Sequence, residues 1–434
     1  MEGKLKPLLT HLLLRRSTHP PNGSLLRSGA VRSQTGGSFS LTATTAVERE
    51  VRKLAEEGML SSGIQIAARV RGVPLLSVWG GCCAVTGKAV EETSLMMPWS
   101  VAKGVASTAL CIVAAREGVC FDDKVTTIWP DFVRRGRSSG KDSTTIADAM
   151  GYRGGMPNHP SLVSQALHAV RGGWRRHWEL GIQWIEEYEP EWQPGTRASY
   201  HPMSFSWIVG GIVEHADGKR RHINQVVATD IAARLGYEQE MYLGCLPPQE
   251  RARVVRQTPH VPQALGLTEE ERFQSACEAS TMTLVGNSKL WSSVCLPSSN
   301  GFFSARALAA MYAAFTNGGS VDGQQLLPAA AVEELLVRVS SPRLVPATPS
   351  RYATKGTSYR DSLGFHPYGH EEPEIYGPLP HCSSIIGCAG AGGSVAFADP
   401  ISGVSVAILK SDYLESRFGL AVAERILNCI KEHA

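Results

Sequence analysis

The chain of 434 residues lacks several features that would assign it to common functional classes. No stretch reaches the roughly 18 uncharged apolar residues that a transmembrane helix needs, so we expect no membrane span. The net charge is only +3, which indicates no strong attraction to nucleic acid or to a membrane. The segment GAGGS at 390–394 has neither a Gly-Lys-Ser/Thr ending nor dinucleotide spacing, so nucleotide binding is not expected.

Cysteine is present, but not in a metal-binding or redox pattern. No two cysteines have C-x-x-C spacing, and no zinc-ligand spacing occurs. Most lie among apolar neighbours, which is typical of buried, reduced thiols in an intracellular protein. We therefore expect no metal and no organic cofactor. The cysteines stand at positions 82, 83, 111, 120, 245, 277, 295, 382, 388 and 429.

The first 45 residues differ from the rest in composition. They are rich in Ser, Thr and Gly, and their apolar stretch PLLTHLLL is too short for a secretory core. Such a leader fits a mitochondrial presequence cleaved somewhere near residues 30 to 50, and a disordered tail in a cytoplasmic protein is the equal alternative. The basic residues are Lys4, Lys6, Arg15, Arg16, Arg27 and Arg32, against the single acid Glu2.

The remaining residues, 46–434, show the patterns of one large domain. An amphipathic helix is expected over 48–60, and two strands over 62–85 around the turn signal RGVP. A helix with Ser304 as its N-cap is expected over 304–319. The pattern over 392–412 predicts a β-hairpin around ADPISG, and an amphipathic helix follows it to the C-terminus.

This order predicts an α/β fold of the α+β type. Both ends of the chain, 46–100 and 300–434, supply strands of one antiparallel sheet flanked by helices. The segment between them, 101–299, forms an inserted subdomain that is mainly helical. With 43% hydrophobic residues, the chain can bury a core of the size such a domain requires.

A lone ammonium group begins a stretch that is otherwise built for burial. From Val101 to Ala115 the residues are small or apolar except Lys103, which stands three positions after Ser100. On a helix the two side chains share a face, so the hydroxyl and the amine can meet. Burial and the positive end of the helix dipole both lower a lysine pKa. A neutral lysine beside a serine is a general base beside a nucleophile.

The Ser-x-x-Lys spacing occurs a second time, at Ser138 and Lys141. The segment SSGK there is polar and contains glycine, so no helix is expected to align the pair. We interpret this second copy as a solvated turn. At the first copy, a lysine that merely extends along the helix start to water is the structural alternative.

The segment PWSVAKGVASTAL resembles the nucleophile helix of the serine β-lactamase and penicillin-binding-protein superfamily. It is most similar to the branch of class C β-lactamases and related serine esterases. Further segments match that branch in order: 116–132, 194–219, 240–247, 299–319 and 387–403. The resemblance covers about residues 48–434 and implies a β-lactamase/transpeptidase-like fold.

The resemblance also implies the site residues. Ser100 would be the nucleophile, Lys103 its base and Tyr200 the group that relays a proton to the leaving group. The N–H groups of Ser100 and Ala391 would form the oxyanion hole, where one lost donor costs about 10² to 10³ in rate. His201, Cys388 and Gly390 would lie on the substrate-binding side.

Two motifs depart from the family pattern. Cys388-Ala389-Gly390 stands where Lys-Thr-Gly or His-x-Gly is usual, and a neutral thiol cannot replace a cation that holds a carboxylate. Pro202 stands where class C β-lactamases have asparagine, so a side-chain amide for a β-lactam is absent. The segment that contains Tyr152 also differs from the family, but it is mainly structural there and has little weight. The departures at Cys388 and Pro202 both favour ester hydrolysis over β-lactam chemistry.

The sequence therefore predicts a serine hydrolase that forms an acyl-enzyme, with small or medium carboxylic esters as the favoured substrates. A peptidase or weak β-lactamase on the same scaffold is one alternative, acting on an amide. The other is a binding or assembly protein without catalysis, since the third motif is degenerate. The partner in the first two cases is a small-molecule ester or amide, and the oligomeric state stays open.

Overall fold

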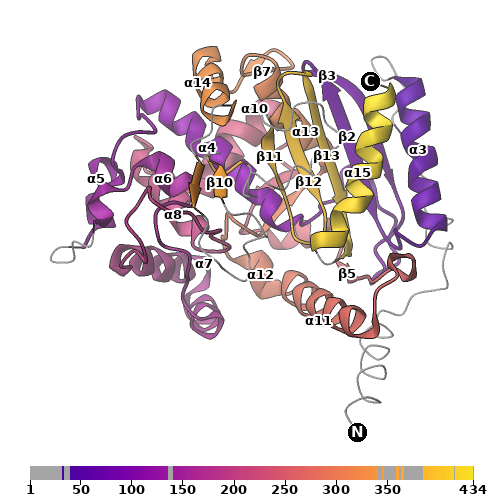
Figure 1. Cartoon of the computed structure of the whole chain (residues 1–434), viewed down its shortest axis with the longest axis horizontal. Coiled ribbons are helices and arrows are strands. Elements are labelled where there is room, and N and C mark those ends of the chain that lie inside the picture. Colours follow the sequence, from indigo (N-terminus) through magenta and orange to yellow (C-terminus); the bar gives the residue numbers. More distant parts are fainter. Residues whose placement is uncertain are drawn as a thin grey trace, which may run out of the picture.

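The computed structural model describes most of the chain (Figure 1). The described residues are 32–33, 40–134, 140–340, 344–346, 358–360, 363–365, 385–414 and 416–433. The leader expected over 1–45 falls mainly on 1–31 and 34–39, which lie outside the described residues. Helix α3 (Leu41–Glu56) begins inside the segment that the sequence set apart, seven residues before the expected start at 48.

A six-stranded antiparallel sheet joins the two ends of the chain, as the sequence predicts, but its edge strand β1 lies at 32–33, inside the segment 1–45 that was expected to be a leader outside the domain. Strand β2 pairs with β13 over seven residues, from Ile64 opposite Lys410 to Val70 opposite Val404. The spatial order is β1 (Arg32–Ser33), β3 (Val73–Gly80), β2 (Ile64–Val70), β13 (Val404–Lys410), β12 (Val395–Asp399) and β11 (Ile386–Ala389).

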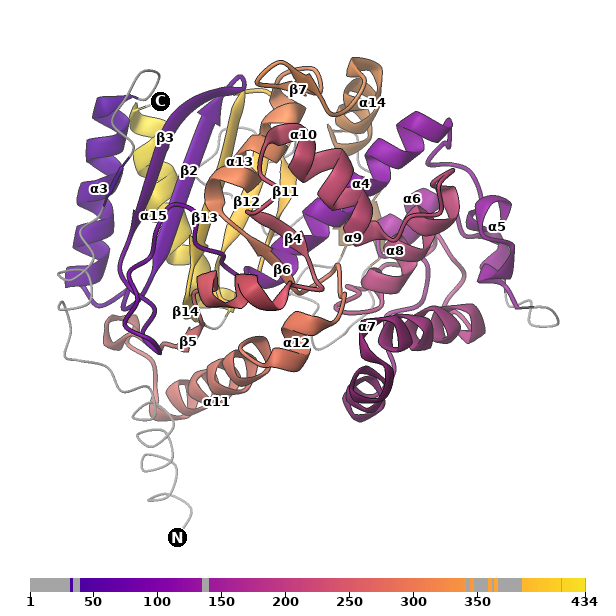
Figure 2. The same ribbon diagram turned by 180° about the vertical axis from the view of Figure 1, so that it is seen from behind.

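The two faces of the sheet bury different helices. Because side chains alternate along a strand, Ile64, Ile66 and Ala68 of β2 face one side, where they pack with α3 and α15 (Ser416–His433). The opposite face, with Ala67 and Ala407, joins the large core that holds α13 (Ala305–Ala313) and the helical region. Figures 1 and 2 show α3 and α15 side by side on the outer face.

Helix α4 (Ala102–Glu117) runs through the centre of the molecule between the sheet and the helical region (Figure 2). Every residue from Ala102 to Ala114 is buried, as expected for a helix that is apolar on all sides. It packs against α8 (Phe205–Ala216) and β11, and Gly118 ends it with a φ of 69°. A charge at its first turn is therefore enclosed by protein on every side.

The helical region is formed by the residues between the two parts of the chain that make the sheet, and it contains two short strands, β4 and β5. Its α-helices are α5 (Val125–Ile128), α6 (Ile146–Met150), α7 (Leu162–Glu187), α8, α9 (Ile223–Val226), α10 (Ala233–Leu235), α11 (Glu269–Gly286) and α12 (Lys289–Ser293), and a π-helix spans Val227–Ala232. Helix α14 (Ala329–Ser340) follows α13. The 3-10 turns are Trp99–Val101, Pro130–Phe132, Lys141–Ser143, Pro248–Arg253, Gln263–Leu265 and Ala314–Thr316.

Short strand pairs lie outside the main sheet. The pairs are β4 (Met241–Leu243) with β6 (Gly301–Phe303), β5 (Thr258–Pro259) with β14 (Asp412–Tyr413), β7 (Ser320–Val321) with β8 (Gln324–Gln325), and β9 (Leu344–Pro346) with β10 (Ser358–Arg360). Within the described ranges, every helix is too short or too polar to cross a bilayer.

Local signals in the sequence placed several elements correctly. The β2–β3 turn is made by Arg71 and Gly72, both with positive φ, as a tight hairpin turn requires. The Ser304 hydroxyl accepts a hydrogen bond from the Ala307 N–H and caps α13. The hairpin around ADPISG is confirmed, with Asp399 opposite Val404.

The prediction that Lys141 lies in a solvated turn is wrong. Its side chain is buried, and Nζ donates hydrogen bonds to the carbonyls of Ile185 and Glu186 at the end of α7. The ammonium also lies 4.6 Å from the centroid of the Phe132 ring. The ends of helices attract cations because their last carbonyls are unpaired, so this lysine closes α7.

The packing of α7 on α8 gives a test of the fold. A Cβ added at Gly181 of α7 would lie 2.0 Å from the indole of the buried Trp207 of α8. We expect Gly181→Ala to lower the free energy of unfolding by about 1–3 kcal/mol, because a well-packed core resists insertion. Urea unfolding measures this.

The matched control is Glu179→Ala, an exposed position on the same helix. We expect it to change stability by less than about 0.5 kcal/mol. Equal unfolding midpoints for the two variants would contradict this close α7–α8 contact.

Candidate active site

Ser100 lies in a turn whose backbone is held in an unusual conformation. Trp99, the preceding residue, has a φ of 51°, which for a bulky side chain costs about 1–3 kcal/mol. Contacts of the Trp99 side chain hold the backbone in this conformation. The Trp99 indole Nε1 donates to Gln257 Oε1 at 2.8 Å, and its ring contacts Trp291 and Tyr413. The strained backbone is therefore at the residue directly before Ser100.

Lys103 lies one turn further, with its side chain fully buried. Its Nζ is 3.4 Å from Ser100 Oγ and donates to the carbonyls of Pro202 at 3.1 Å and Ser298 at 3.0 Å. All three acceptors are neutral. Burial lowers the Lys103 pKa to about 7, against a smaller opposing influence of Cys388. The amine is thus poised between its two protonation states near neutral pH.

Tyr200 approaches the same serine from the segment before α8. Its hydroxyl donates to Ser100 Oγ at 2.7 Å. The Lys103 Nζ lies 4.7 Å from the centroid of the Tyr200 ring, and the Tyr152 ring packs 5.3 Å from that ring. The structure therefore brings Ser100, Lys103 and Tyr200 together around one oxygen atom.

His201 is fully buried, and both ring nitrogens contact protein groups. Its Nδ1 lies 2.5 Å from the Ser199 carbonyl, and Nε2 accepts from the Met156 N–H at 3.3 Å. Burial lowers the His201 pKa to about 4, so the ring is neutral at physiological pH. These contacts leave no ring nitrogen free to bind substrate and instead fix the segment that carries Tyr200.

Cys388 and Gly390 lie at the end of strand β11. The Cys388 side chain is fully buried and donates to the Gly364 carbonyl at 3.3 Å, and burial raises its pKa to about 12. It is a neutral filler beside α4. A Cβ at Gly390 would lie 1.9 Å from the Pro98 carbonyl and 3.4 Å from the Ser100 nitrogen. Only glycine lets this strand end approach the Ser100 turn so closely.

Ala391 follows directly and packs, half-buried, beside the cluster that contains Trp99 and Tyr413. Gly390 N donates to the Ser394 carbonyl at 2.8 Å, and Gly393 N donates to the Gly390 carbonyl at 2.9 Å. These bonds close a tight turn. In this turn Ala391 directly follows Gly390, the residue that lies against the Ser100 turn.

Sequence reasoning missed the groups that hold Lys103. They are the backbone carbonyls of Pro202 and Ser298, which leave no trace in residue identity. The loop of Ser298 is fixed by Ser206 of α8, whose Oγ accepts from the Ser298 N–H at 3.0 Å. It is also fixed by the buried Asn300, whose Oδ1 accepts from the Leu296 N–H at 2.8 Å.

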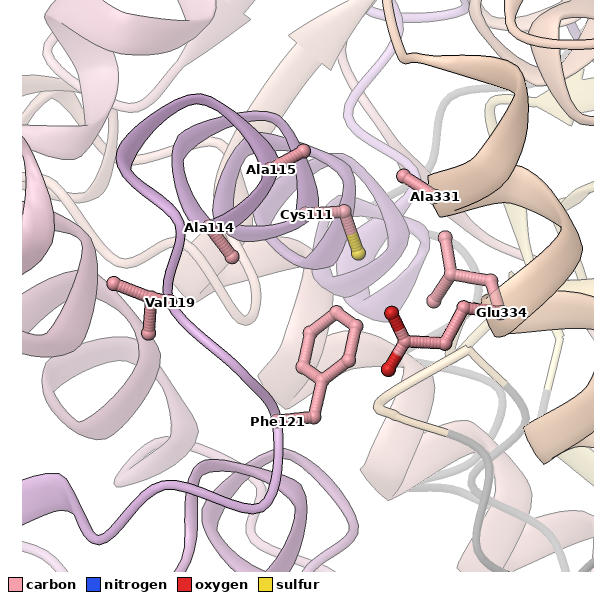
Figure 3. A pocket seen from close by; sticks show the side chains of 8 residues that line it. Cys111, Ala114, Ala115, Val119, Phe121, Ala331 and Glu334 are labelled. Atoms are coloured by element: carbon pink, nitrogen blue, oxygen red, sulfur yellow. The ribbon is translucent and has the colours of Figure 1, made fainter.

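A small pocket lies away from this site, beside the last turns of α4 and helix α14 (Figure 3). Cys111, Phe121 and Glu334 line it, with a volume of about 40 Å³. Ligand sites of drug-sized molecules measure roughly 300–1,000 Å³, so this pocket is too small for one. Burial raises the Cys111 pKa, which keeps the thiol unreactive.

The part of the chain that the structure describes holds no cluster of three or more His, Cys, Asp or Glu suited to a metal ion. The nine cysteines within it are free thiols. Cys382 lies outside the described residues.

The fold, with a serine hydroxyl held between a buried lysine and a tyrosine, defines a serine hydrolase. The chain belongs to the Beta-lactamase family, whose model matches residues 51–427. This confirms the superfamily and the fold that the sequence motifs predict.

Individual relatives agree with this assignment. The chain is 25% identical over 378 residues to the esterase/beta-lactamase LipL of Mycobacterium tuberculosis (strain ATCC 25618 / H37Rv), covering 82% of this chain and 79% of that protein. The fold is similar to that of a family VIII carboxylesterase, with a TM-score of 0.72, 21% identity and coverage of 93% and 100%. The fold is also similar to that of a penicillin-binding protein homologue from Caulobacter crescentus, with a TM-score of 0.70 and 23% identity. The match covers 92% of this chain and 99% of that chain.

The buried lysine gives a test of the site's electrostatics. We expect Lys103 to titrate at a pH of about 7, because burial disfavours its charged form, whereas a free lysine side chain titrates near ~10.4. NMR of isotope-labelled lysine side chains measures this, with the signal assigned through its loss in Lys103→Met.

Lys141→Met assigns the second lysine whose pKa burial lowers to about 7, so the two signals are separable. A Lys103 signal that still reports an ammonium at pH 9 would contradict the proposed neutral base.

Proposed function

We propose that the protein is a carboxylesterase that hydrolyses small or medium esters through an acyl-enzyme on Ser100. The observation that carries this proposal is the pair of contacts on Ser100 Oγ, from the buried amine of Lys103 at 3.4 Å and the Tyr200 hydroxyl at 2.7 Å. A serine becomes a nucleophile when a neighbouring base can take its proton. The three oxygen atoms that accept hydrogen bonds from Lys103 Nζ are neutral, so none of them stabilises the charged form of the amine as a carboxylate would.

The steps follow from these positions. Lys103 takes the proton of Ser100, and Ser100 Oγ attacks the ester carbonyl carbon. The N–H groups of Ser100 and Ala391 stabilise the oxyanion. The proton passes through Tyr200 to the leaving oxygen, and the alcohol departs. Water then attacks the acyl group, its proton returns through Lys103 and Tyr200, and the acid is released with Ser100 restored.

Two features favour an ester over a β-lactam or a peptide. Cys388 occupies the place of the usual cation and is a buried neutral thiol, so it cannot hold a substrate carboxylate. Pro202 supplies no side-chain amide, and its carbonyl is engaged by Lys103. The name of one structural neighbour, a family VIII carboxylesterase, supports the same choice, whereas that of the esterase/beta-lactamase LipL fits both substrates.

The other site residues take supporting roles in this proposal. His201 positions the Tyr200 segment, and Gly390 allows the Ala391 turn to approach Ser100. Two further expectations from the sequence stay predictions. One is a mitochondrial location, based on the basic leader. The other is the set of boundaries between leader, sheet subdomain and helical subdomain, at about residues 45, 100 and 300.

The nucleophile is tested by labelling. We expect a fluorophosphonate probe to add once to the protein, and the adduct to be absent in Ser100→Ala, because the proposal assigns the activated nucleophile to Ser100. Intact-mass spectrometry measures the adduct. Ester hydrolysis by Ser100→Ala should fall by at least about 10³-fold.

The control is Ser138→Ala, which removes the serine of the second Ser-x-x-Lys copy and should leave labelling unchanged. A folded wild-type protein that takes no adduct would favour the alternative of a binding protein without catalysis.

Substrate class and pH dependence are tested together. We expect kcat/KM for a short-chain ester to fall about tenfold per pH unit below pH 7, because protonated Lys103 cannot act as a base, and to level off above it. A chromogenic cephalosporin should be turned over at least about 10²-fold more slowly, since one lost contact to a required group costs that order of rate.

Cephalosporin rates that rival the ester would instead support the weak β-lactamase. An ester rate that does not vary between pH 5.5 and 8 would remove Lys103 from the proposed role of base.

A further inference from the structure

The first half of helix α7 concentrates exposed apolar side chains. Four large ones lie within nine residues: Leu162 is 58% exposed, Val163 71%, Leu167 47% and Val170 75%. The other exposed large apolar residues among those described are scattered: Leu41, Val73, Val85, Trp184, Leu284, Val337 and Ile401. Single exposed apolar residues are ordinary, but a contiguous group marks an interaction site. We call these four residues the α7 patch.

Three of the four patch residues lie on one outward face of the helix, and Leu162 lies at its start. Val163, Leu167 and Val170 follow the i, i+4, i+7 spacing of one helical face. Gln165 and Ala169, on the opposite side, are buried against the protein. Figures 1 and 2 show α7 at the edge of the helical region, far from α3 and α15. The apolar face therefore points away from the molecule.

Positive charge accompanies the patch. Arg171, Arg175 and Arg176 are exposed and follow it directly, around a break in the helix at Gly172 and Gly173. The segment 161–178 contains no Asp or Glu. The Arg175 guanidinium lies 4.7 Å from the centroid of the Trp174 ring, so an aromatic group joins the basic cluster. The acid that follows next in the sequence is the exposed Glu179, three and four positions after Arg176 and Arg175, so the three arginines keep a net positive charge.

We propose that the α7 patch docks on an anionic lipid surface. Aliphatic side chains on one face, followed by more arginines than acids, are the pattern of a helix that lies in a bilayer interface. The aliphatic face enters the boundary of the acyl chains, and the arginines pair with lipid phosphates. The near-neutral net charge of the chain does not oppose this, because three arginines lie together beside the patch.

A second copy of the chain is a poorer occupant. In a two-fold dimer the same patch meets itself, so the arginines of one protomer would face those of the other. Segment 161–178 offers no carboxylate to compensate for that repulsion.

Vesicle co-sedimentation of the full chain tests the proposal. The vesicles are phosphatidylcholine alone, or phosphatidylcholine with about one quarter phosphatidylglycerol. We expect binding to the anionic vesicles that weakens as salt rises. A chain with Val163→Ser, Leu167→Ser and Val170→Ser should bind at least about tenfold more weakly, because it lacks the apolar face.

The matched control chain carries Val73→Ser, Leu284→Ser and Val337→Ser, which removes one leucine and two valines of similar exposure elsewhere. It should bind as the wild type does. The basic residues between 4 and 32 are common to all variants, so they cannot produce a difference between them. Thermal unfolding checks that both chains fold.

Three outcomes would overturn the proposal. One is the absence of wild-type binding to anionic vesicles at low salt. Another is equal binding by the patch variant and the control. The third is a wild-type dimer in sedimentation velocity that only the patch variant dissolves, which would show that a second copy covers the patch.

Discussion

The burial of the Lys103 ammonium is the constraint on which the rest of the site depends. Its pKa falls from 10.5 to about 7, so the folded state disfavours the charged form. Below pH 7 the full penalty applies, about 5 kcal/mol at 1.36 kcal/mol per pKa unit. It fades as the pH rises from 7 towards 10.5, where the unfolded chain also loses the proton. The large core around α4 must offset this penalty.

Residues that are distant in the sequence surround the buried amine of Lys103. The carbonyls of Pro202 and Ser298 are close to 100 and 200 residues away from Lys103, yet both accept its hydrogen bonds. Neutral acceptors satisfy the donors of the amine without restoring its charge, as a carboxylate would. Two bulky residues with positive φ, Trp99 and Tyr152, flank Ser100 and Tyr200. Both hold a backbone conformation that is uncommon for bulky side chains, and such strain is found most often at functional sites.

Several local features of the fold and of the site could be predicted from the sequence. The turn of Arg71 and Gly72, the Ser304 cap and the hairpin after Val395 depend on neighbouring residues, and the sequence placed all three correctly. The spacing of Ser100 and Lys103 likewise contains its own geometry, since three positions on a helix bring side chains together. Lys141 shows the limit. Its segment is polar, but residues of α7 more than forty positions away bury it.

The sequence by itself determined the order of elements, the superfamily and the identity of Ser100, Lys103 and Tyr200 as candidates, because spacing and motif order are local or shared with relatives. The tertiary structure alone decided that neutral oxygen atoms accept the hydrogen bonds of Lys103, that His201 is buried, and that the Cys388 thiol is enclosed. It also decided which face of α7 points outward. Burial and backbone acceptors set these properties, and both arise from contacts between segments that the sequence does not place side by side.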